Sequence, residues 1–367
     1  MRLLRSRIAA TILLVWVGPL VAADTNLWPA RATADSIELT DVVGRAPRDL
    51  GRFGRCRILE LDRSNPAATE YLVVTEHVRR RDNSQQVTVK HPGGSFRLPM
   101  ARYNGSTATI APTTAPRPRG LFIYLTGIIG LTPPEETLVA TFRAAGWHTL
   151  VSETSFNFMQ RRYVRIEPKT QAETARRLGR EVNEHLADKA YAVEALLELM
   201  AKRHPQMLAG SRILAGGSAG SIALPAVAVR TGKSDALILI GTGGHAARIV
   251  TESSLVPLGL YREEAKGTDR KRRWLTPAEL PEIQKLMLAE TRLDPLRLAP
   301  RLKAIPTLMI RAELDQMVPA ATNDLLHEAL GRPERWSLPL NHIMLFGALQ
   351  LQSGMILQWT EKSILKN

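Results

Sequence analysis

The sequence predicts an α/β fold: a doubly wound, mostly parallel sheet over residues 119–367, preceded by an N-terminal β extension. Segments typical of strands and helices alternate after Arg119, which favours right-handed crossovers between parallel strands. The strand-like runs are almost entirely apolar, as expected where helices cover both faces of a sheet. A turn of small residues at 216–220 joins one such run to a helical segment. In such sheets ligands bind at the carboxyl ends of the strands.

The first 23 residues have the pattern of a secretory signal peptide. Arg2, Arg5 and Arg7 form a basic start, residues 8–20 form a short apolar core, and residues 21–23 are small or apolar and suited to cleavage. The apolar run is too short to favour a permanent membrane span. We therefore expect a periplasmic or secreted protein, with an uncleaved membrane anchor as the alternative reading.

Residues 24–118 are expected to form a lead-in and a β extension. Up to about residue 54 the sequence has little periodicity. Short β-rich runs follow, separated by breaks such as Asn65-Pro66, and this spacing suits an antiparallel meander. The runs are residues 57–61, 71–78, 86–90 and 107–110. Three prolines between residues 112 and 118 predict a stiff connector to the α/β part.

The α/β part has a regular order of elements with one interruption. Strands are expected at 121–125, 148–152, 212–215, 235–240, 306–311 and 335–338, and helices at about 134–145, 171–203, 221–230, 320–330 and 345–364. The alternation stops between residues 246 and 300, where a basic cluster at 270–273 and a helix at about 278–290 stand among polar loops. This stretch is expected to be a lid or cap inserted over the strand ends.

The turn Gly216-Gly217-Ser218-Ala219-Gly220 matches G-x-S-x-G between a predicted strand and a predicted helix. A serine on so sharp a turn takes strained backbone angles, and small neighbours leave room for it. The N–H of Ala219, in the first turn of the helix, has no partner inside the helix and can face an anion beside Ser218. The bare pattern also fits an ordinary glycine-rich turn, so the rest of the chain has to decide.

An acid and a base follow Ser218 in the order that this architecture requires. A serine hydroxyl needs a base to remove its proton and a carboxylate to orient that base. Asp315 and His342 each follow a predicted strand, in the order Ser, Asp, His. Glu313 is the competing acid, but Asp315 precedes the Val-Pro turn and is preferred. His245 also follows a strand and is expected to line the pocket rather than to act as the base.

Three spaced motifs now resemble the α/β-hydrolase superfamily. They are the turn around Ser218, the strand Pro-Thr-Leu-Met-Ile at 306–310 leading to Asp-Gln-Met-Val-Pro at 315–319, and Asn341-His342 before the last helix. The match covers residues 119–367. The resemblance implies an eight-stranded sheet and an acyl-enzyme mechanism on Ser218, Asp315 and His342, and it does not name a substrate.

The chain departs from that family pattern in its oxyanion loop. Many relatives carry His-Gly after the third strand, whereas this chain has Thr126-Gly127, with Ile128 at the position of the second oxyanion donor. A backbone N–H does not depend on the side chain, so Ile128 can pair with Ala219 to form an oxyanion hole, while its side chain narrows the acyl pocket.

Composition excludes several other classes of function. The formal net charge is +14, but the basic residues are scattered and no nucleic-acid module surrounds them, so no specific nucleic-acid partner is expected. A solvated surface explains the charge, and attraction to an anionic envelope surface or to an acidic substrate is the sharper explanation. Cys56 is the single cysteine, so no internal disulfide forms. Histidines lack metal-ligand spacing and glycine turns lack phosphate-binding fingerprints, so neither metal nor cofactor is expected.

The resemblance and the triad candidates together imply a secreted or periplasmic serine hydrolase that cleaves a carboxylic ester of an acyl substrate. Peptidase and acyltransferase activities on the same fold remain open, because exclusion of water from an acyl-enzyme is not visible in sequence. A non-catalytic binding or scaffold protein is the alternative from another class, since fold does not fix function. Oligomeric state is left open.

Overall fold

The computed structural model describes residues 27–30, 33–44, 47–62, 67–76, 86–91, 93–100, 102–154, 162–255, 258–266 and 269–364. The expected signal peptide, residues 1–23, lies outside these ranges. Within them, no helix combines the length and the apolar character that crossing a membrane requires.

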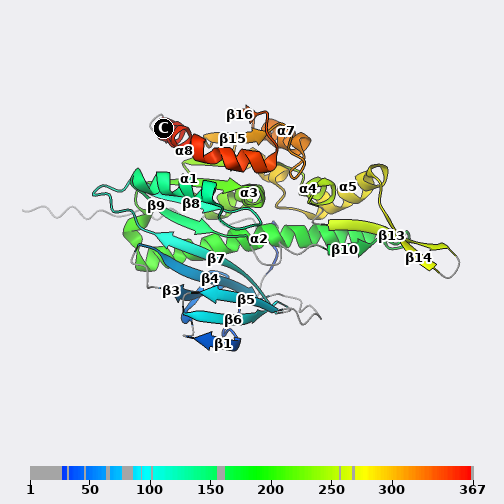
Figure 1. Ribbon diagram of the computed structural model, residues 1–367, viewed down its shortest axis with the longest axis horizontal. Coiled ribbons are helices and arrows are strands. Elements are labelled where there is room, and N and C mark those ends of the chain that lie inside the picture. Colours follow the sequence, from blue (N-terminus) through cyan, green and yellow to red (C-terminus); the bar gives the residue numbers. More distant parts are fainter. Residues whose placement is uncertain are drawn as a thin grey trace, which may run out of the picture.

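A large sheet organises the molecule (Figure 1). Its strands are β2 (Arg48–Phe53), β3 (Cys56–Asp62), β4 (Thr69–Glu76), β7 (Tyr103–Ala111), β8 (Gly120–Leu125), β9 (Trp147–Ser152), β11 (Ser211–Gly217), β12 (Ala236–Ile240), β15 (Thr307–Ala312) and β16 (Glu334–Leu338). Their order in the sheet is β16-β15-β12-β11-β8-β9-β7-β4-β3-β2. Strands β16 to β9 in this order pair in parallel, which confirms the predicted mostly parallel α/β sheet.

The described sheet has ten strands rather than the eight that the resemblance implied, because β2 and β3 extend its antiparallel edge. Outside residues 246–300, the described helices are α1 (Pro133–Ala144), α2 (Gln171–Arg203), α3 (Ala219–Thr231), α7 (Ala320–Ala329) and α8 (His342–Ile364). Three 3-10 turns, η2 (Pro205–Leu208), η3 (Pro277–Glu279) and η4 (Ala299–Arg301), join neighbouring elements. Most helix bounds lie within one or two residues of those expected from sequence, and α8 begins three residues earlier.

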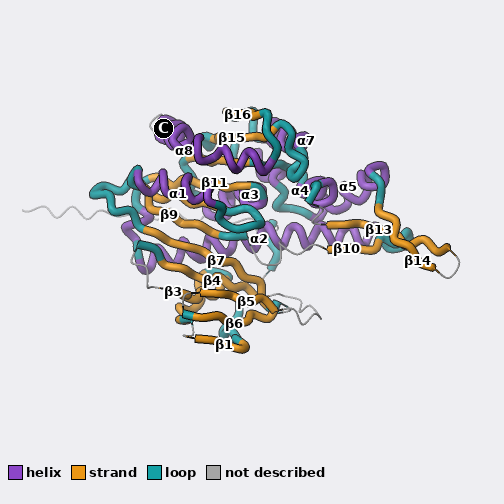
Figure 2. The backbone as a smooth tube through the Cα atoms, viewed as in Figure 1, coloured by secondary structure: helices purple, strands orange, loops and turns teal. Residues whose placement is uncertain are grey.

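Helices cover both faces of the sheet, as Figure 2 shows with the strands in orange between purple helices. All six residues of β8 are buried. Leu121 and Ile123 face a core built with α2 and α3, whereas Phe122 and Tyr124 face a second core built with α1 and α8. Burial on both faces is what the unbroken apolar run of β8 predicts.

The N-terminal β extension belongs to the same sheet, since β7 pairs antiparallel with β9 and with β4. The single meander expected from sequence is wrong in its pairing. Strand β5 (Gln86–His91) leaves the main sheet and joins β6 (Gly94–Pro99) and β1 (Thr40–Gly44) in a separate three-stranded sheet. Three buried side chains of this small sheet, Val89 of β5 and Phe96 and Leu98 of β6, pack against Leu72 and Val74 of β4. This packing explains why the β5–β6 hairpin folds back onto the main sheet.

Residues 246–300 contain more regular structure than expected. They form α4 (Ala246–Glu252), β13 (Leu258–Lys266), β14 (Asp269–Trp274), α5 (Leu280–Glu290) and α6 (Pro295–Leu298). Strand β13 pairs with β14 and with β10 (Arg162–Arg165), making a small sheet that projects beside α2 (Figure 1). The basic cluster lies on β14, and Arg273 is paired with Glu264 and Glu279, so part of its charge is neutralised locally. Helix α5 packs against α2.

Candidate active site

Ser218 occupies the junction of β11 and α3 with backbone angles φ 50° and ψ −121°. A positive φ is uncommon for a residue with a side chain and stores strain that its surroundings must hold. The Ser218 N–H donates to the Ile240 carbonyl at 2.9 Å, and the Ser218 carbonyl accepts from Ile222 N–H at 3.1 Å and from Ser221 Oγ at 2.7 Å. These three bonds hold the strained turn between β12 and the first turn of α3.

Gly216 and Gly220, the two glycines of the predicted G-x-S-x-G turn, permit close packing that no side chain would allow. A Cβ on Gly220 would lie 2.2 Å from the Leu125 carbonyl oxygen, and one on Gly216 would lie 2.9 Å from the Gly220 carbonyl carbon. Both distances are far below van der Waals contact, so α3 approaches β8 this closely only with glycine at these positions. Gly217, which sequence analysis did not single out, is equally confined, with Glu135 Oε1 2.8 Å from the place of its Cβ.

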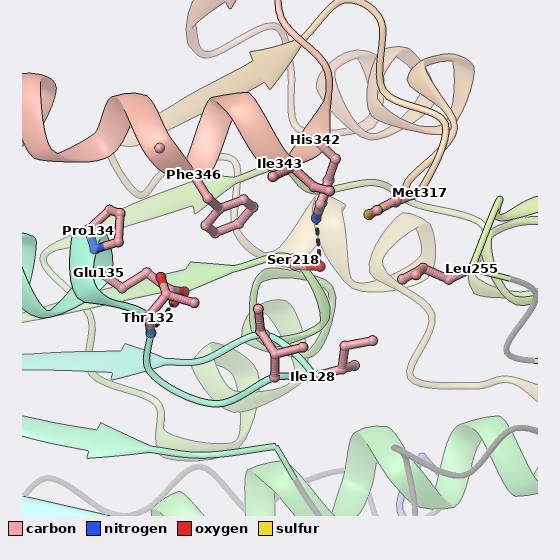
Figure 3. A pocket seen from close by; sticks show the side chains of 13 residues that line it. Ile128, Thr132, Pro134, Glu135, Ser218, Leu255, Met317, His342, Ile343 and Phe346 are labelled. Atoms are coloured by element: carbon pink, nitrogen blue, oxygen red, sulfur yellow. Dashed lines mark hydrogen bonds between the residues drawn. The ribbon is translucent and has the colours of Figure 1, made fainter.

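A hydrogen-bonded chain of three side chains ends at the serine, and Figure 3 shows its last link, from His342 to Ser218. His342 Nε2 is 3.0 Å from Ser218 Oγ, and His342 Nδ1 is 2.6 Å from Asp315 Oδ2. The other oxygen, Asp315 Oδ1, accepts from the N–H groups of Met317 at 2.9 Å and Val318 at 2.8 Å. Asp315 and His342 are both buried. The structure therefore brings together all three residues that the motif order selected.

The two competing candidates lie elsewhere. Glu313 is exposed, and its N–H is bonded to the Leu338 carbonyl at the edge strand. His245 is not among the described residues lining the serine pocket, so the expectation that it lines the pocket is wrong. Its backbone is left-handed, with φ 63°, and it caps α4 while its N–H donates to Asp294. The position of His245 after β12 is therefore explained by its role as the N-terminal cap of α4.

The predicted oxyanion loop passes directly beside Ser218. A Cβ placed on Gly127 would lie 3.3 Å from Ser218 Cβ, so the loop can approach this closely because Gly127 has no side chain. Thr126 is fixed from both sides: its N–H donates to the Ser152 carbonyl at 3.2 Å, and its carbonyl accepts from Thr154 Oγ1 at 2.8 Å. Ile128 follows within a tight turn that closes where Gly130 N–H meets the Gly127 carbonyl.

Ala219 supplies the other predicted donor. It is the first residue of α3, so its N–H has no carbonyl one turn earlier in the helix to bond. The positive end of the α3 dipole lies at the same place, which favours negative charge beside Ser218. Ile128 is among the residues that line the serine pocket, whereas Ala219 is among those that line a separate small cavity with Lys189 and Ile222.

The serine opens into a largely apolar cavity of about 410 Å³ (Figure 3). It is lined by Gly127, Ile128, Ile129, Thr132, Pro134, Glu135, Ser218, Leu255, Met317, His342, Ile343, Phe346 and Gly347. Of the described part of residues 246–300, Leu255 alone reaches this wall. No group of three or more His, Cys, Asp or Glu side chains able to hold a metal ion occurs among the described residues.

Glu135 is a buried charge beside the serine that sequence analysis missed. Its carboxylate accepts from Thr132 N–H at 2.8 Å, from Thr132 Oγ1 at 2.6 Å and from the Tyr124 hydroxyl at 2.8 Å. Burial and then the nearby carboxylate raise the pKa of Tyr124 well above its ordinary value. The pattern Thr132-Pro133-Pro134-Glu135 is a capping box with proline at the helix start, and it is the signal that predicts this contact.

Lys189 is the second buried group that was missed. Its Nζ donates to the Ser152 carbonyl and to Ser152 Oγ, both at 3.2 Å, and to the Glu153 carbonyl. Burial lowers the pKa of Lys189 to about 7. Because the Ser152 carbonyl also accepts from Thr126, Lys189 supports the strand end on which the oxyanion loop rests. In sequence it occupies an apolar position of the α2 stripe formed with Val182, Leu186 and Val193.

Comparisons with known proteins found no matching family model and no matching curated protein. Solved structures with a similar course of the chain were found. Est1E from Butyrivibrio proteoclasticus is 13% identical, with 77% of this chain and 100% of that chain covered and a TM-score of 0.48. The Pyrococcus furiosus esterase Pf2001 is 10% identical, with 76% and 90% covered and a TM-score of 0.43. The esterase domain of a Rhodothermus marinus protein is 14% identical, with 76% and 98% covered and a TM-score of 0.42.

The fold is assigned on the chain's own geometry. The parallel strands run β16-β15-β12-β11-β8-β9, and the antiparallel β7 follows. The serine stands on a strained turn after β11, the acid follows β15, and the histidine follows β16. This strand order, with a Ser-Asp-His constellation at the carboxyl ends of the strands, gives the chain an α/β-hydrolase fold.

Proposed function

We propose that this chain is a serine hydrolase that cleaves carboxylic esters through Ser218, His342 and Asp315. The observation that carries the proposal is the unbroken hydrogen-bonded chain from Asp315 to Ser218 Oγ, which ends in an apolar cavity. A buried carboxylate, an imidazole and a hydroxyl in this order are what activation of a serine requires.

In the first half of the reaction, Ser218 Oγ attacks the ester carbonyl carbon while His342 Nε2 takes the hydroxyl proton. Asp315 Oδ2 accepts from His342 Nδ1–H, which keeps Nε2 free as the base and stabilises the imidazolium that forms. The N–H groups of Ala219 and Ile128 would bind the oxyanion of the tetrahedral intermediate. The intermediate collapses to an acyl-enzyme, and the alcohol leaves with the proton from His342.

In the second half, a water molecule gives its proton to His342 and attacks the acyl carbon. The acyl–Oγ bond breaks, the proton returns to Ser218, and a carboxylic acid is released. The cavity is largely apolar, with Ile, Leu, Met and Phe side chains in its wall, so it favours an apolar acyl or alcohol group. Its volume of about 410 Å³ lies in the range of pockets that enclose small molecules.

A fluorophosphonate probe tests the nucleophile, because it reacts covalently with an activated serine. The wild-type chain should be labelled, and Ser218→Ala should remove the labelling. Ser254→Ala is the matched control, since Ser254 is an exposed serine beside the pocket residue Leu255. Labelling of Ser218→Ala at the wild-type rate would show that another residue is the nucleophile.

A series of p-nitrophenyl esters with increasing acyl length then tests the substrate class. Turnover should rise from acetyl to medium-length chains and fall once the chain exceeds the cavity. Labelling without turnover of any ester, thioester or amide would favour the binding or scaffold alternative.

We further propose that residues 1–23 direct export and that residues 246–300 act as a lid that selects substrates. N-terminal sequencing of the chain from an envelope fraction tests export, and a mature start near Asp24 is expected. Retention of Met1 in that fraction would favour an uncleaved anchor. For the lid, Leu255→Ala should change the preference among acyl lengths, and an unchanged preference would contradict it.

A further inference from the structure

Helix α8 presents an uncharged surface to solvent, and we name it the α8 ridge. The ridge consists of exposed residues spaced along one face, Ile343, Met344, Gly347, Gln350, Leu351, Gly354, Met355 and Gln358. Leu351 is 85% exposed and Met355 is 52% exposed. The opposite face of α8 is buried through Leu345, Leu349 and Ile356. A surface helix ordinarily carries charged residues on its solvent side, so two uncharged faces need an explanation.

The ridge is continuous with the mouth of the serine pocket. Ile343 and Gly347 belong to the ridge and also line the cavity beside Ser218. Across the mouth, the turn after β8 holds out Ile129, which is 79% exposed and also lines the cavity. In Figure 3, Ile343 and Phe346 of α8 lie above the serine and Ile128 lies below it. An apolar ligand could therefore pass from the ridge to the serine without leaving an apolar surface.

Charge favours a lipid surface as the occupant. The formal net charge is +14 for the full chain and +11 without Arg2, Arg5 and Arg7 of the expected signal peptide, so the remaining chain is still attracted to anionic surfaces. The ridge itself has no charge that would need to be desolvated on contact. Lys362, which is exposed in the last turn of α8, stands at the far end of the ridge, where an anionic headgroup can meet it. A second copy of the chain on the same ridge would cover the pocket mouth, whereas a bilayer covers the ridge and can supply a substrate there.

We propose that the α8 ridge docks this protein on an anionic lipid bilayer and that its substrate is an amphiphilic ester drawn from that bilayer. The proposal about the substrate rests on the proposed ester hydrolysis, whereas the proposal about docking does not depend on it. The ridge side chains would enter the interface while the pocket mouth faces the lipid. The ester carbonyl would then reach Ser218 with its apolar chain in the cavity.

Sedimentation with vesicles tests the docking. Wild type and variants are mixed with vesicles of phosphatidylcholine alone or with about 30% phosphatidylglycerol, and all carry the same N-terminus so that any contribution of residues 1–23 cancels. Leu351→Glu places a charge on the ridge outside the pocket. Leu325→Glu is the matched control, because Leu325 is an exposed leucine on α7.

Wild type and Leu325→Glu should bind the anionic vesicles more strongly than the neutral ones. Leu351→Glu should bind the anionic vesicles about tenfold more weakly, since a buried leucine contact is replaced by an unfavourable charge. Equal binding by Leu351→Glu and Leu325→Glu would overturn the proposal. So would a wild-type dimer in sedimentation equilibrium that Leu351→Glu dissociates, because the occupant would then be a second copy.

Hydrolysis assays test the proposal about the substrate separately from the proposal about docking. Leu351→Glu should leave turnover of soluble p-nitrophenyl butyrate unchanged and should reduce, about tenfold, turnover of an ester lipid held in the anionic vesicles. If ridge-dependent docking is observed but neither ester is cleaved by the wild type, the proposed hydrolysis fails and the docking stands. If the vesicle ester is cleaved equally by both proteins, the substrate does not arrive by way of the ridge.

Discussion

Replacing Lys189 with methionine should change how the stability of the protein depends on pH. In the folded chain, burial lowers the pKa of Lys189 to about 7 from an ordinary value of 10.5. Below pH 7 Lys189 is protonated in both the folded and the unfolded chain, so the full cost of burying its ammonium group lowers the free energy of unfolding. Between about pH 7 and 10.5 the unfolded chain still binds the proton and the folded chain has released it. The contribution of Lys189 to the free energy of unfolding must therefore rise with pH between about pH 7 and 10.5.

The magnitude follows from the linkage relation. One proton bound by the unfolded chain alone changes the free energy of unfolding by about 1.4 kcal/mol for each pH unit. Lys189→Met removes this contribution and leaves all other titrating groups in place. The difference in free energy of unfolding, wild type minus Lys189→Met, should therefore rise by about 2 to 3 kcal/mol between about pH 7.5 and 9.5.

Urea unfolding followed by far-UV circular dichroism at several pH values measures this difference. Lys202→Met is the control, because Lys202 lies on the same helix with its side chain 58% exposed and paired with Glu198. Its difference from wild type should stay constant over the same pH range. If the Lys189→Met difference is equally constant, Lys189 keeps its proton in the folded chain and the linkage argument is wrong.

Three further substitutions, the first with a matched control, test the packing and the chemistry of the site. Gly220→Ala should lower the free energy of unfolding by about 3 kcal/mol, because its Cβ would lie 2.2 Å from a backbone oxygen. Gly354→Ala is the control, since Gly354 of α8 has open space around it, and it should raise the free energy of unfolding by about 0.5–1 kcal/mol. Melting temperatures that shift in the same direction in both variants would contradict this. Asp315→Asn should reduce kcat for a soluble ester about 10⁴-fold with little change in KM, and a loss below tenfold would refute its role as the orienting acid. Glu135→Gln should raise KM several-fold and lower stability by about 1–3 kcal/mol, because an amide cannot accept all three bonds made by the carboxylate; an unchanged KM would show that this contact does not shape the pocket.

Much of the site could be predicted because its parts are local patterns repeated at one edge of a sheet. Ser218, Asp315 and His342 each follow a recognisable apolar strand, and parallel strands bring their carboxyl ends to the same edge. The distances from His342 to the other two residues could not be read from sequence, since they depend on how α8 packs. The same holds for the cavity, whose wall comes from several separate loops and helices.

Strand partners were the weakest part of the prediction. The run at 86–90 was correctly read as a strand, but it pairs with β6 instead of joining the main sheet. This pairing depends on the apolar face that the hairpin covers, which is formed by β3, β4 and the start of β7. The hairpin β13–β14 was missed because its stability comes from cross-strand pairs such as Arg273 with Glu264, which have no apolar alternation. Lys189 was missed because a lysine at an apolar helix position is usually treated as an exception to the pattern.

The pairing of β7 with β9 makes the whole sheet a single cooperative unit. Were the chain shortened to begin at residue 119, β9 would become an edge strand with a row of unpaired backbone donors and acceptors. The apolar side chains of α2 that now pack against Tyr71 and Ile110 would be uncovered at the same time. Such a fragment would keep every residue of the triad and still associate through its bare edge instead of folding alone. We therefore expect the α/β part to need the N-terminal strands in order to fold alone, although none of their described residues lines the serine pocket.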